Sequence, residues 1–388
     1  MHDHLIQLFF LIFSGAAVLA SLALFGRQPL LVAYIALGAL IGPHGLGWVT
    51  DTSTISQISE IGIMFLLFLL GLDMQPQALL KVFRQVTHIT LVSSLLFSGV
   101  GYAMGLLFGY TSTESLIIGV AMMFSSTIVG IKLLPTTALH HKHSGELMVG
   151  MLLMQDFIAI FVLMFLIAGD TGTPDLGQLS RSFLALPLLA VIAVVIVRYV
   201  LLPLFSRFER IGEYVFLVAI GWCLGMSEAA SFLGLSREIG AFVGGISIAT
   251  CQFSKYIALN LKPLRDFFLI LFFFSLGSGF DISLIPDIAI AAATIAAMIL
   301  IIKPVTYHYL LRSQSESDSL AWDIGFRLGQ NSEFSLLIAY VAFNSALISN
   351  LASHLIQAAA IITFIVSSYI VVFNFPTPIA TTDRLRRD

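Results

Sequence analysis

Long apolar segments separated by short polar linkers run along almost the whole of this 388-residue chain. Hydropathy and helix breakers predict thirteen of them, each long enough for a membrane-spanning helix. They cover residues about 5–25, 28–46, 55–73, 84–108, 113–138, 144–169, 183–206, 211–228, 234–252, 260–279, 286–311, 320–344 and 350–374. Only 11% of the residues are charged, whereas a soluble domain carries about 25%. We therefore expect an all-α polytopic membrane protein in which residues 1–388 form one transmembrane unit.

Lysine and arginine residues predict the orientation of this protein in the membrane. They gather in alternate linkers and at the C-terminal end, at Arg27, Lys81, Arg84, Lys142, Arg207, Arg210, Lys255, Arg312, Arg384, Arg386 and Arg387. The positive-inside rule makes these positions cytoplasmic. The N-terminus is then outside and the C-terminus cytoplasmic, which requires an odd number of spans. No transit sequence precedes the first apolar segment, so the expected location is a bacterial inner (cell) membrane.

Composition and motifs disfavour several other classes of protein. The formal net charge of −3 and the absence of a basic stripe from the sequence argue against nucleic acid as a partner. Cys223 and Cys251 both fall inside apolar segments, where neither a disulfide framework nor a zinc site is expected. The sequence holds no His-Glu-x-x-His or Gly-x-Ser-x-Gly motif. We expect neither an enzyme nor a protein with a bound cofactor or resident metal.

Asp156 lies near the middle of the apolar stretch from about Ser144 to Gly169. A helix of this length spans a bilayer, so the carboxylate is expected close to the membrane midplane. A charge at that depth costs about 2.5–3.5 kcal/mol even on lenient insertion scales, and such residues usually mark an ion or proton pathway. Transport is therefore the first functional hypothesis.

Two predicted spans carry polar, helix-weakening clusters at mid-depth. The fifth span contains Ser125-Ser126-Thr127 and Lys132, and the twelfth contains Arg327 and Asn331-Ser332-Glu333. They lie seven spans apart and so cross the membrane in opposite directions, a pattern typical of inverted repeats whose broken helices cross at a midplane site. Facing helix ends leave partial charges, which the charged residues Lys132, Arg327 and Glu333 would offset. The alternative is that the small polar residues only allow close helix packing.

Lys303 is a second charge inside a predicted span, and Pro304 follows it. A lysine at this depth needs a partner, and Asp156 is the expected one. The alternative is that Lys303 braces the fold or extends its ammonium group to the cytoplasmic face.

A set of motifs follows in order along nearly the whole chain. It comprises Gly42-Pro43-His44-Gly45-Leu46-Gly47, the run from Glu60 to Asp73, Ser125-Ser126-Thr127, Gln155-Asp156, Gly240 to Gly245, Phe272 to Gly277, Ile302-Lys303, and Gly329 to Phe334. This ordered set resembles the monovalent cation:proton antiporter-2 family, and most closely the membrane domain of Kef-type potassium efflux systems.

The resemblance implies the architecture and assembly of a sodium/proton antiporter-like fold. It implies thirteen helices, divided into core ion-transport helices at about 55–169 and 260–374 and dimerisation helices at about 5–46 and 183–252. Two crossed discontinuous helices, here the fifth and twelfth spans, would lie in the core, and the protein would be a homodimer. The sequence has no Gly-x-Gly-x-x-Gly, so the Kef regulatory nucleotide-binding domain is expected to be absent from this chain. A cytoplasmic regulatory domain or an ancillary subunit is then a candidate partner.

The resemblance also implies that Asp156 binds the cation or the proton and that Lys303 pairs with it. Ser125, Ser126, Thr127 and Gln155 would add neutral oxygens that replace part of the hydration shell of the cation. A single carboxylate that binds either a proton or a cation gives obligatory exchange. We expect one proton per cation, and hence electroneutral transport by alternating access.

The identity of the transported cation depends on the residue before Asp156. Gln155 at that position is similar to the potassium-efflux branch, so K⁺ is favoured, and a Na⁺/H⁺ antiporter of the same fold is the first alternative. A sodium-coupled organic anion symporter would need a roomier, neutral site. A gated ion channel would need a continuous pore.

Overall fold

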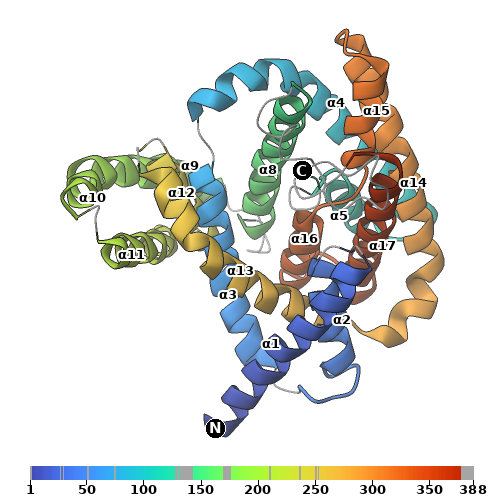
Figure 1. The fold of residues 1–388 in the computed structure, drawn as a ribbon, viewed down its shortest axis with the longest axis horizontal. Helices are drawn as coiled ribbons and strands as arrows, with labels where there is room; N and C mark the ends of the chain where they lie inside the picture. The colour runs from blue at the N-terminus through green and yellow to red at the C-terminus, as the bar shows by residue number, and fades with distance from the viewer. Residues whose placement is uncertain are drawn as a thin grey trace. The chain divides into compact units, whose positions relative to one another are not determined.

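The computed structural model describes residues 2–26, 28, 30–49, 52–73, 76–126, 130, 143–168, 176–208, 211–235, 237–249, 251 and 253–376. Within these ranges every regular element is a helix (Figure 1). The all-α prediction is therefore confirmed for the described part of the chain.

The chain divides into two compact units, each assembled from separate stretches of sequence. The first comprises Met1–Trp48, Leu80–Leu163 and Gly277–Asp388, and the second comprises Val49–Leu79 and Met164–Leu276. The predicted grouping into core and dimerisation helices concerns function rather than compactness, and it stays a prediction.

The first unit contains the helices on which the candidate site is built. Its elements are α1 (His2–Phe25), α2 (Leu30–Ile41), most of α4 (Pro76–Leu107), α5 (Ser112–Met122), most of α8 (His143–Ala168), the short 3₁₀ turn η3 (Ile282–Leu284), α14 (Ile285–Ser313), α15 (Asp318–Arg327), α16 (Glu333–Asn344) and α17 (Asn350–Asn374). Helix α14 packs on α15 and α17, while α16 packs on α5 and α17. Figure 1 shows α5, α16 and α17 side by side.

The second unit is built around a close crossing of two helices. Its elements are α3 (Thr52–Asp73), α9 (Leu176–Ile196), the π-helical turn η2 (Val197–Leu201), α10 (Leu202–Phe208), α11 (Gly212–Phe232), α12 (Arg237–Ala249) and most of α13 (Ser254–Ser278). A Cβ on Gly71 would lie 2.6 Å from the carbonyl oxygen of Phe242, and a Cβ on Gly245 would clash with the carbonyl oxygen of Phe68. Glycine is therefore required where α3 meets α12.

Adding one methyl group at this crossing is expected to destabilise the second unit. The Gly245→Ala variant must separate α3 from α12, because the obstructing atom is backbone, and we expect a loss of about 1–3 kcal/mol. Gly221→Ala on α11 is the matched control, since no atom lies within 4 Å of its Cβ position. Thermal unfolding in detergent checks this expectation, and equal midpoints for the two variants would contradict it.

Seven helices among the described residues are long and apolar enough to cross a membrane. They comprise Ile6–Phe25, Val86–Leu107, His143–Leu163, Ala185–Phe208, Gly212–Phe232, Ile282–Ser313 and Asn350–Asn374. Shorter apolar helices accompany them at Leu30–Ile41, Glu60–Leu69, Ser112–Met122, Ile239–Ala249 and Glu333–Asn344. The multi-pass prediction is confirmed, and the count of thirteen spans stays a prediction.

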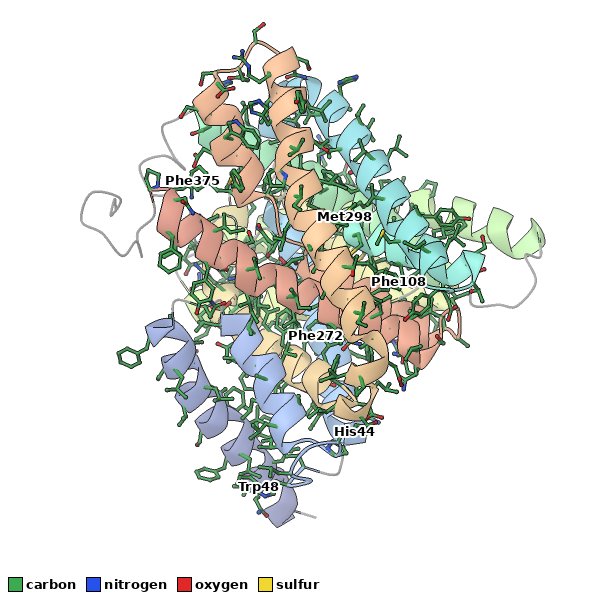
Figure 2. All side chains as sticks on the ribbon, turned by 90° about the vertical axis from the view of Figure 1, so that its right-hand side faces the viewer. His44, Trp48, Phe108, Phe272, Met298 and Phe375 are labelled. Atoms are coloured by element: carbon green, nitrogen blue, oxygen red, sulfur yellow. The ribbon has the colours of Figure 1, made fainter. Side chains whose placement is uncertain are left out.

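The outer faces of these helices carry large apolar side chains. Phe25 of α1 and Phe232 of α11 are each 88% exposed. Figure 2 shows carbon-rich side chains along the helices, Met298 among them, and Trp48 in the segment after α2. Such faces are stable in hydrocarbon, where the helix has already satisfied its own backbone groups.

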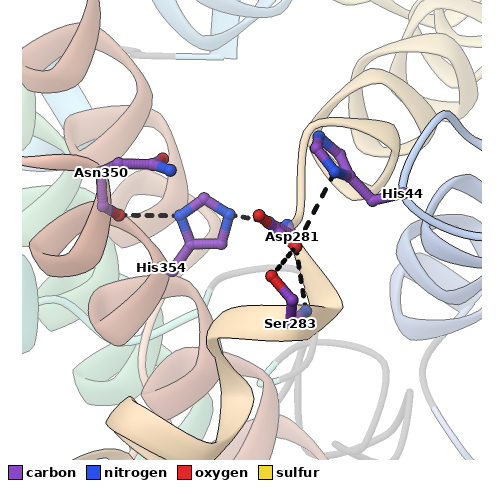
Figure 3. A network of polar contacts seen from close by, with 5 residues as sticks. All are labelled: His44, Asp281, Ser283, Asn350 and His354. Carbon is purple, nitrogen blue, oxygen red and sulfur yellow. Dashed lines mark hydrogen bonds and ion pairs between the residues drawn. The ribbon is translucent and has the colours of Figure 1, made fainter.

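A polar network joins three segments at one end of the first unit (Figure 3). His354, one turn after the first residue of α17, places Nδ1 2.8 Å from the carbonyl oxygen of Asn350, while its Nε2 accepts a hydrogen bond of 2.8 Å from the backbone N–H of Asp281. A carbonyl only accepts and an N–H only donates, so these partners orient the His354 ring with Nδ1 toward the acceptor and Nε2 toward the donor. Asp281 Oδ1 also lies 3.8 Å from Nδ1 of His44, which follows α2.

The Asp281 carboxylate makes stability depend on pH at this end. Hydrogen bonds from the hydroxyl and the backbone N–H of Ser283, with added attraction from His44, hold the Asp281 pKa below its usual value. A lowered pKa contributes stability above the usual carboxyl value of ~3.9, and the contribution is lost as the pH falls below it.

We therefore expect the difference in thermal midpoint between the wild type and Asp281→Asn to shrink as the pH is lowered from 7 to 3. Asp287→Asn, in the first turn of α14, is the control for the loss of a carboxylate near this end. A difference that stays constant over this range would refute the assignment.

Candidate functional site

The first of two non-helical segments, residues 124–126, follows α5 and is called the first break. This helix begins with a capping box between Thr111 and Glu114 and ends at Met122, and residues 124–126 are not helical. Ser125 and Ser126 are fully buried there. Serine hydroxyls bond readily to backbone groups outside a helix, which favours a break at this position.

The second break separates α15 from α16. Helix α15 ends at Arg327, and Ser332 caps the N-terminus of α16 by accepting a hydrogen bond of 3.1 Å from the backbone N–H of Phe334. The backbone N–H of Ser332 in turn donates to Ser335 Oγ over 3.3 Å. This reciprocal cap fixes where the second half of the broken helix begins.

The two breaks contact each other directly, although they lie about 200 residues apart. Ser125 Oγ donates to the carbonyl oxygen of Leu328 over 2.8 Å, and Ser126 Oγ donates to Glu333 Oε2 over 2.6 Å. The side chain of Gln330 donates to the carbonyl oxygen of Ser126 over 3.4 Å. The described residues therefore show the fifth and twelfth predicted spans meeting at their non-helical segments, and the discontinuity of the fifth span itself stays a prediction.

The ammonium group of Lys303 lies between the two breaks. Its Nζ donates to the carbonyl oxygens of Phe124 and Gln330, at 2.6 and 2.9 Å, and contacts Asn331 Oδ1 at 3.3 Å. Phe124 follows the C-terminus of α5 and Gln330 follows that of α15, so Lys303 neutralises the negative ends of both helix dipoles. The predicted pairing of Lys303 with Asp156 stays a prediction.

Helix α17 forms hydrogen bonds with the second break. The backbone N–H of Asn331 donates to Thr363 Oγ1 over 3.0 Å, and Ser367 Oγ donates to Gln330 Oε1 over 3.0 Å. Asn331 also directs its amide nitrogen toward the sulfur of Met122 at 3.0 Å. These bonds hold the carbonyl groups that surround Lys303 in place.

Gln155 and Asp156 bring α8 to the first break, and both side chains are about 1% exposed. The Oε1 atom of Gln155 accepts the backbone N–H of Ser125 over 3.0 Å, and its Nε2 donates to the hydroxyl of Tyr307 over 2.7 Å. The amide of Gln155 therefore joins the break to α14. The predicted roles of Gln155 and Asp156 as cation ligands stay predictions.

The charged residues of the second break have different partners. Arg327 is buried and donates to Asp323 Oδ1 over 2.9 Å and to the carbonyl oxygen of Pro376 over 2.8 Å. Glu333 is the first residue of α16, where a carboxylate stabilises the positive end of the helix dipole. The predicted compensating roles of Glu333 and Arg327 stay predictions.

Two predicted site residues, Thr127 and Lys132, lie outside the described residues. Three other residues at the site were not predicted from the sequence. They are Tyr307, Thr363 and Ser367, and their contacts place them at the site. Tyr307 follows Lys303 by one helical turn, a spacing that puts two side chains on one face and that was the available signal.

The sequence matches the family described as sodium/hydrogen exchanger, transmembrane, over residues 9–375. The iron transporter MagA of Paramagnetospirillum magneticum is 26% identical over 352 residues, which cover 88% of this chain and 79% of that protein. A putative K⁺ efflux antiporter, KefB, of Alkalimonas amylolytica is 28% identical over 384 residues, which cover 95% of this chain and 56% of that protein. The chain spans about half the length of the K⁺ efflux antiporters that it matches.

A solved structure shares the fold. The sodium proton antiporter MjNhaP1 from Methanocaldococcus jannaschii superposes with a TM-score of 0.68 and 16% sequence identity, covering 95% of this chain and 99% of that chain. At this identity the likeness shows the fold alone, and the predicted antiporter-like fold is confirmed.

Proposed function

This chain belongs to the transmembrane sodium/hydrogen exchanger family, as its motifs predict, and from that premise we propose that it exchanges a monovalent cation for protons across a membrane. K⁺ is the favoured cation, because curated relatives are named as K⁺ efflux antiporters and because Gln155 precedes Asp156. Na⁺ is the alternative within the same fold. Family membership disfavours the organic anion symporter and the channel.

The proposal rests on the position of one buried carboxylate. Asp156 follows Gln155, whose amide is bonded to the backbone of the first break, so the carboxylate lies on the helix that is fastened to this break. Ser125 and Ser126 contribute buried hydroxyl oxygens from the same break. Neutral oxygens with one carboxylate suit a weakly hydrated monovalent cation, whereas divalent ions favour sites with more carboxylates.

The charge balance of the site supports exchange without net charge movement. The ammonium group of Lys303 is bonded to the carbonyl oxygens that follow two helices, which keeps it in place while the occupant of Asp156 changes. Asp156 is then neutralised in turn by a proton and by a cation. One proton would move for each cation, and the unit that carries the site would move to alternate access.

The oligomeric state and the cellular location of the protein are part of the proposal. We propose a homodimer in a bacterial inner membrane, with the N-terminus outside and the C-terminus in the cytoplasm. The distribution of lysine and arginine supports the orientation. A cytoplasmic regulatory domain or ancillary subunit would complete a transporter of the length of its K⁺ efflux relatives.

The experiment is ion-dependent proton flux in proteoliposomes that contain a pH dye. K⁺, Na⁺ and choline are added separately at several pH values, together with Fe²⁺ because one relative is named as an iron transporter. We expect proton movement with K⁺, less with Na⁺, none with choline, and rates independent of an imposed membrane potential. Absence of flux with every ion would refute the proposal, and potential-dependent rates would refute the one-to-one stoichiometry.

A further inference from the structure

Tyr307 lies on α14, one helical turn after Lys303, and its side chain is fully buried. Its ring meets Phe97 of α4 in an edge-to-face arrangement, with 5.4 Å between ring centroids. Phe97 also lies 5.5 Å from the Nζ of Lys303, so the two α14 side chains share this neighbour. A buried tyrosine hydroxyl needs polar partners, and Tyr307 finds them at the first break.

The partners of Gln155 define the orientation of its amide group. Oε1 faces the backbone N–H of Ser125, which only donates, and Nε2 faces the carbonyl oxygen of Met123 at 3.4 Å, which only accepts. With the amide flipped, its NH₂ group would face the N–H of Ser125 and its oxygen would face the carbonyl oxygen of Met123. Only one orientation therefore satisfies both backbone groups. The shortest bond of this amide is the one from Nε2 to the Tyr307 hydroxyl, at 2.7 Å.

Two serine side chains also lie near the Tyr307 hydroxyl. They are Ser93 of α4 and Ser125 of the first break. Each serine gives its own proton to a carbonyl oxygen, Ser93 to that of Thr90 over 3.1 Å and Ser125 to that of Leu328 over 2.8 Å. The bond that Tyr307 accepts from Gln155 Nε2 joins α8 to α14 next to the first break.

We infer that Tyr307 is a positioning residue for the cation site, an inference that rests on the function proposed above. Its hydroxyl fixes the amide of Gln155, and that amide holds the Asp156 turn of α8 against the backbone of Ser125. Tyr307 acts through Gln155 and does not itself contact the cation. Its loss would loosen the geometry of the binding site and leave the carboxylate that carries the proton unchanged.

The test is the Tyr307→Phe variant in the proteoliposome assay. The variant keeps the ring and its packing on Phe97 and removes only the hydroxyl. Loss of one buried hydrogen bond from the scaffold of the site is expected to raise the apparent KM for the cation about five- to tenfold. The maximal rate is expected to stay within about twofold of the wild type, because weaker binding alone raises KM. A merely structural defect would instead lower the amount of active protein and hence the maximal rate.

Tyr309→Phe is the matched control, since Tyr309 lies on the same helix and is 69% exposed. A second comparison uses Gln155→Met: in that background Tyr307→Phe is expected to add little, because the bond that it would remove is already gone. If Tyr307→Phe does not fold, Ser93→Ala takes its place, with an expected rise in KM of about twofold from the loss of one polar neighbour of the Tyr307 hydroxyl.

The outcomes separate the inference from the proposed function. The inference would be overturned if the apparent KM of Tyr307→Phe equalled that of Tyr309→Phe. The same holds for Ser93→Ala where that variant replaces Tyr307→Phe. Exchange by the wild type would still uphold the proposed function in that case. Fully additive effects in the double variant would also overturn the inference. A wild type without exchange would overturn the proposed function, and the inference with it.

Discussion

Replacing Asp156 with asparagine is expected to reduce cation-driven proton flux to the level of vesicles without protein. Asparagine keeps the size of the side chain but neither binds a proton near neutral pH nor offers a negative charge to a cation. Asp156 is 1% exposed on α8, next to the residue that fastens this helix to the first break. No other group is assigned to carry the proton, so the effect should be complete with K⁺ and with Na⁺.

The matched control for this experiment is Asp266→Asn on α13, whose side chain is 56% exposed and paired with Arg265. It removes a carboxylate of the same type from the surface and is expected to leave exchange unchanged. Both variants should elute as single peaks with the wild-type retention volume. If Asp156→Asn exchanged at the wild-type rate, the midplane carboxylate would not be the carrier, and Glu333 would be the next residue to replace.

Replacing Lys303 with methionine is expected to be the most destabilising substitution at the site. Methionine fills much the same volume, but the carbonyl oxygens of Phe124 and Gln330 would lose their donor in a buried environment. Each unsatisfied buried group costs about 1–3 kcal/mol, so the loss is expected to be about 3 kcal/mol or more. Removing the desolvation cost of the ammonium group offsets part of this loss, but the two helix ends remain uncompensated.

Thermal unfolding in detergent measures this effect, with Lys262→Met on α13 as the control. Lys262 is exposed, and its replacement should leave the midpoint nearly unchanged. Lys303→Arg restores the charge with a different geometry, and we expect it to recover part of the stability. A Lys303→Met protein as stable as the wild type would show that the carbonyl groups do not depend on the ammonium group.

Asp156 and Lys303 illustrate what can be predicted from the sequence. Both were recognised because a charge inside an apolar segment is costly and therefore unusual, which is a local property that hydropathy detects. The partners of Lys303 were not predicted: an ion pair with Asp156 was expected, and the described contacts are carbonyl oxygens from the two breaks. The pairing with Asp156 itself stays a prediction.

For Arg327 and Gln155, too, the sequence does not predict which atoms the side chain contacts. Arg327 was expected to offset the ends of the broken helix, and its described donors reach Asp323 one turn away and Pro376 after α17. Gln155 was expected to offer its amide oxygen to a cation, and that oxygen accepts the backbone N–H of Ser125. The site roles of both residues stay predictions, and each has a described partner that is distant in sequence, Pro376 for Arg327 and Ser125 for Gln155.

The sequence by itself determined the helical class, the membrane environment and the positions of the breaks. The reason is that a chain in a bilayer must satisfy its backbone groups within each span, so hydropathy and helix-breaking residues act locally. Tertiary structure alone decided which atoms meet across the breaks, as when Ser125 reaches Leu328 over a separation of 203 residues. Those contacts depend on how α5, α8, α14 and α16 pack, and packing is set by the fit of side chains that the linear pattern does not encode.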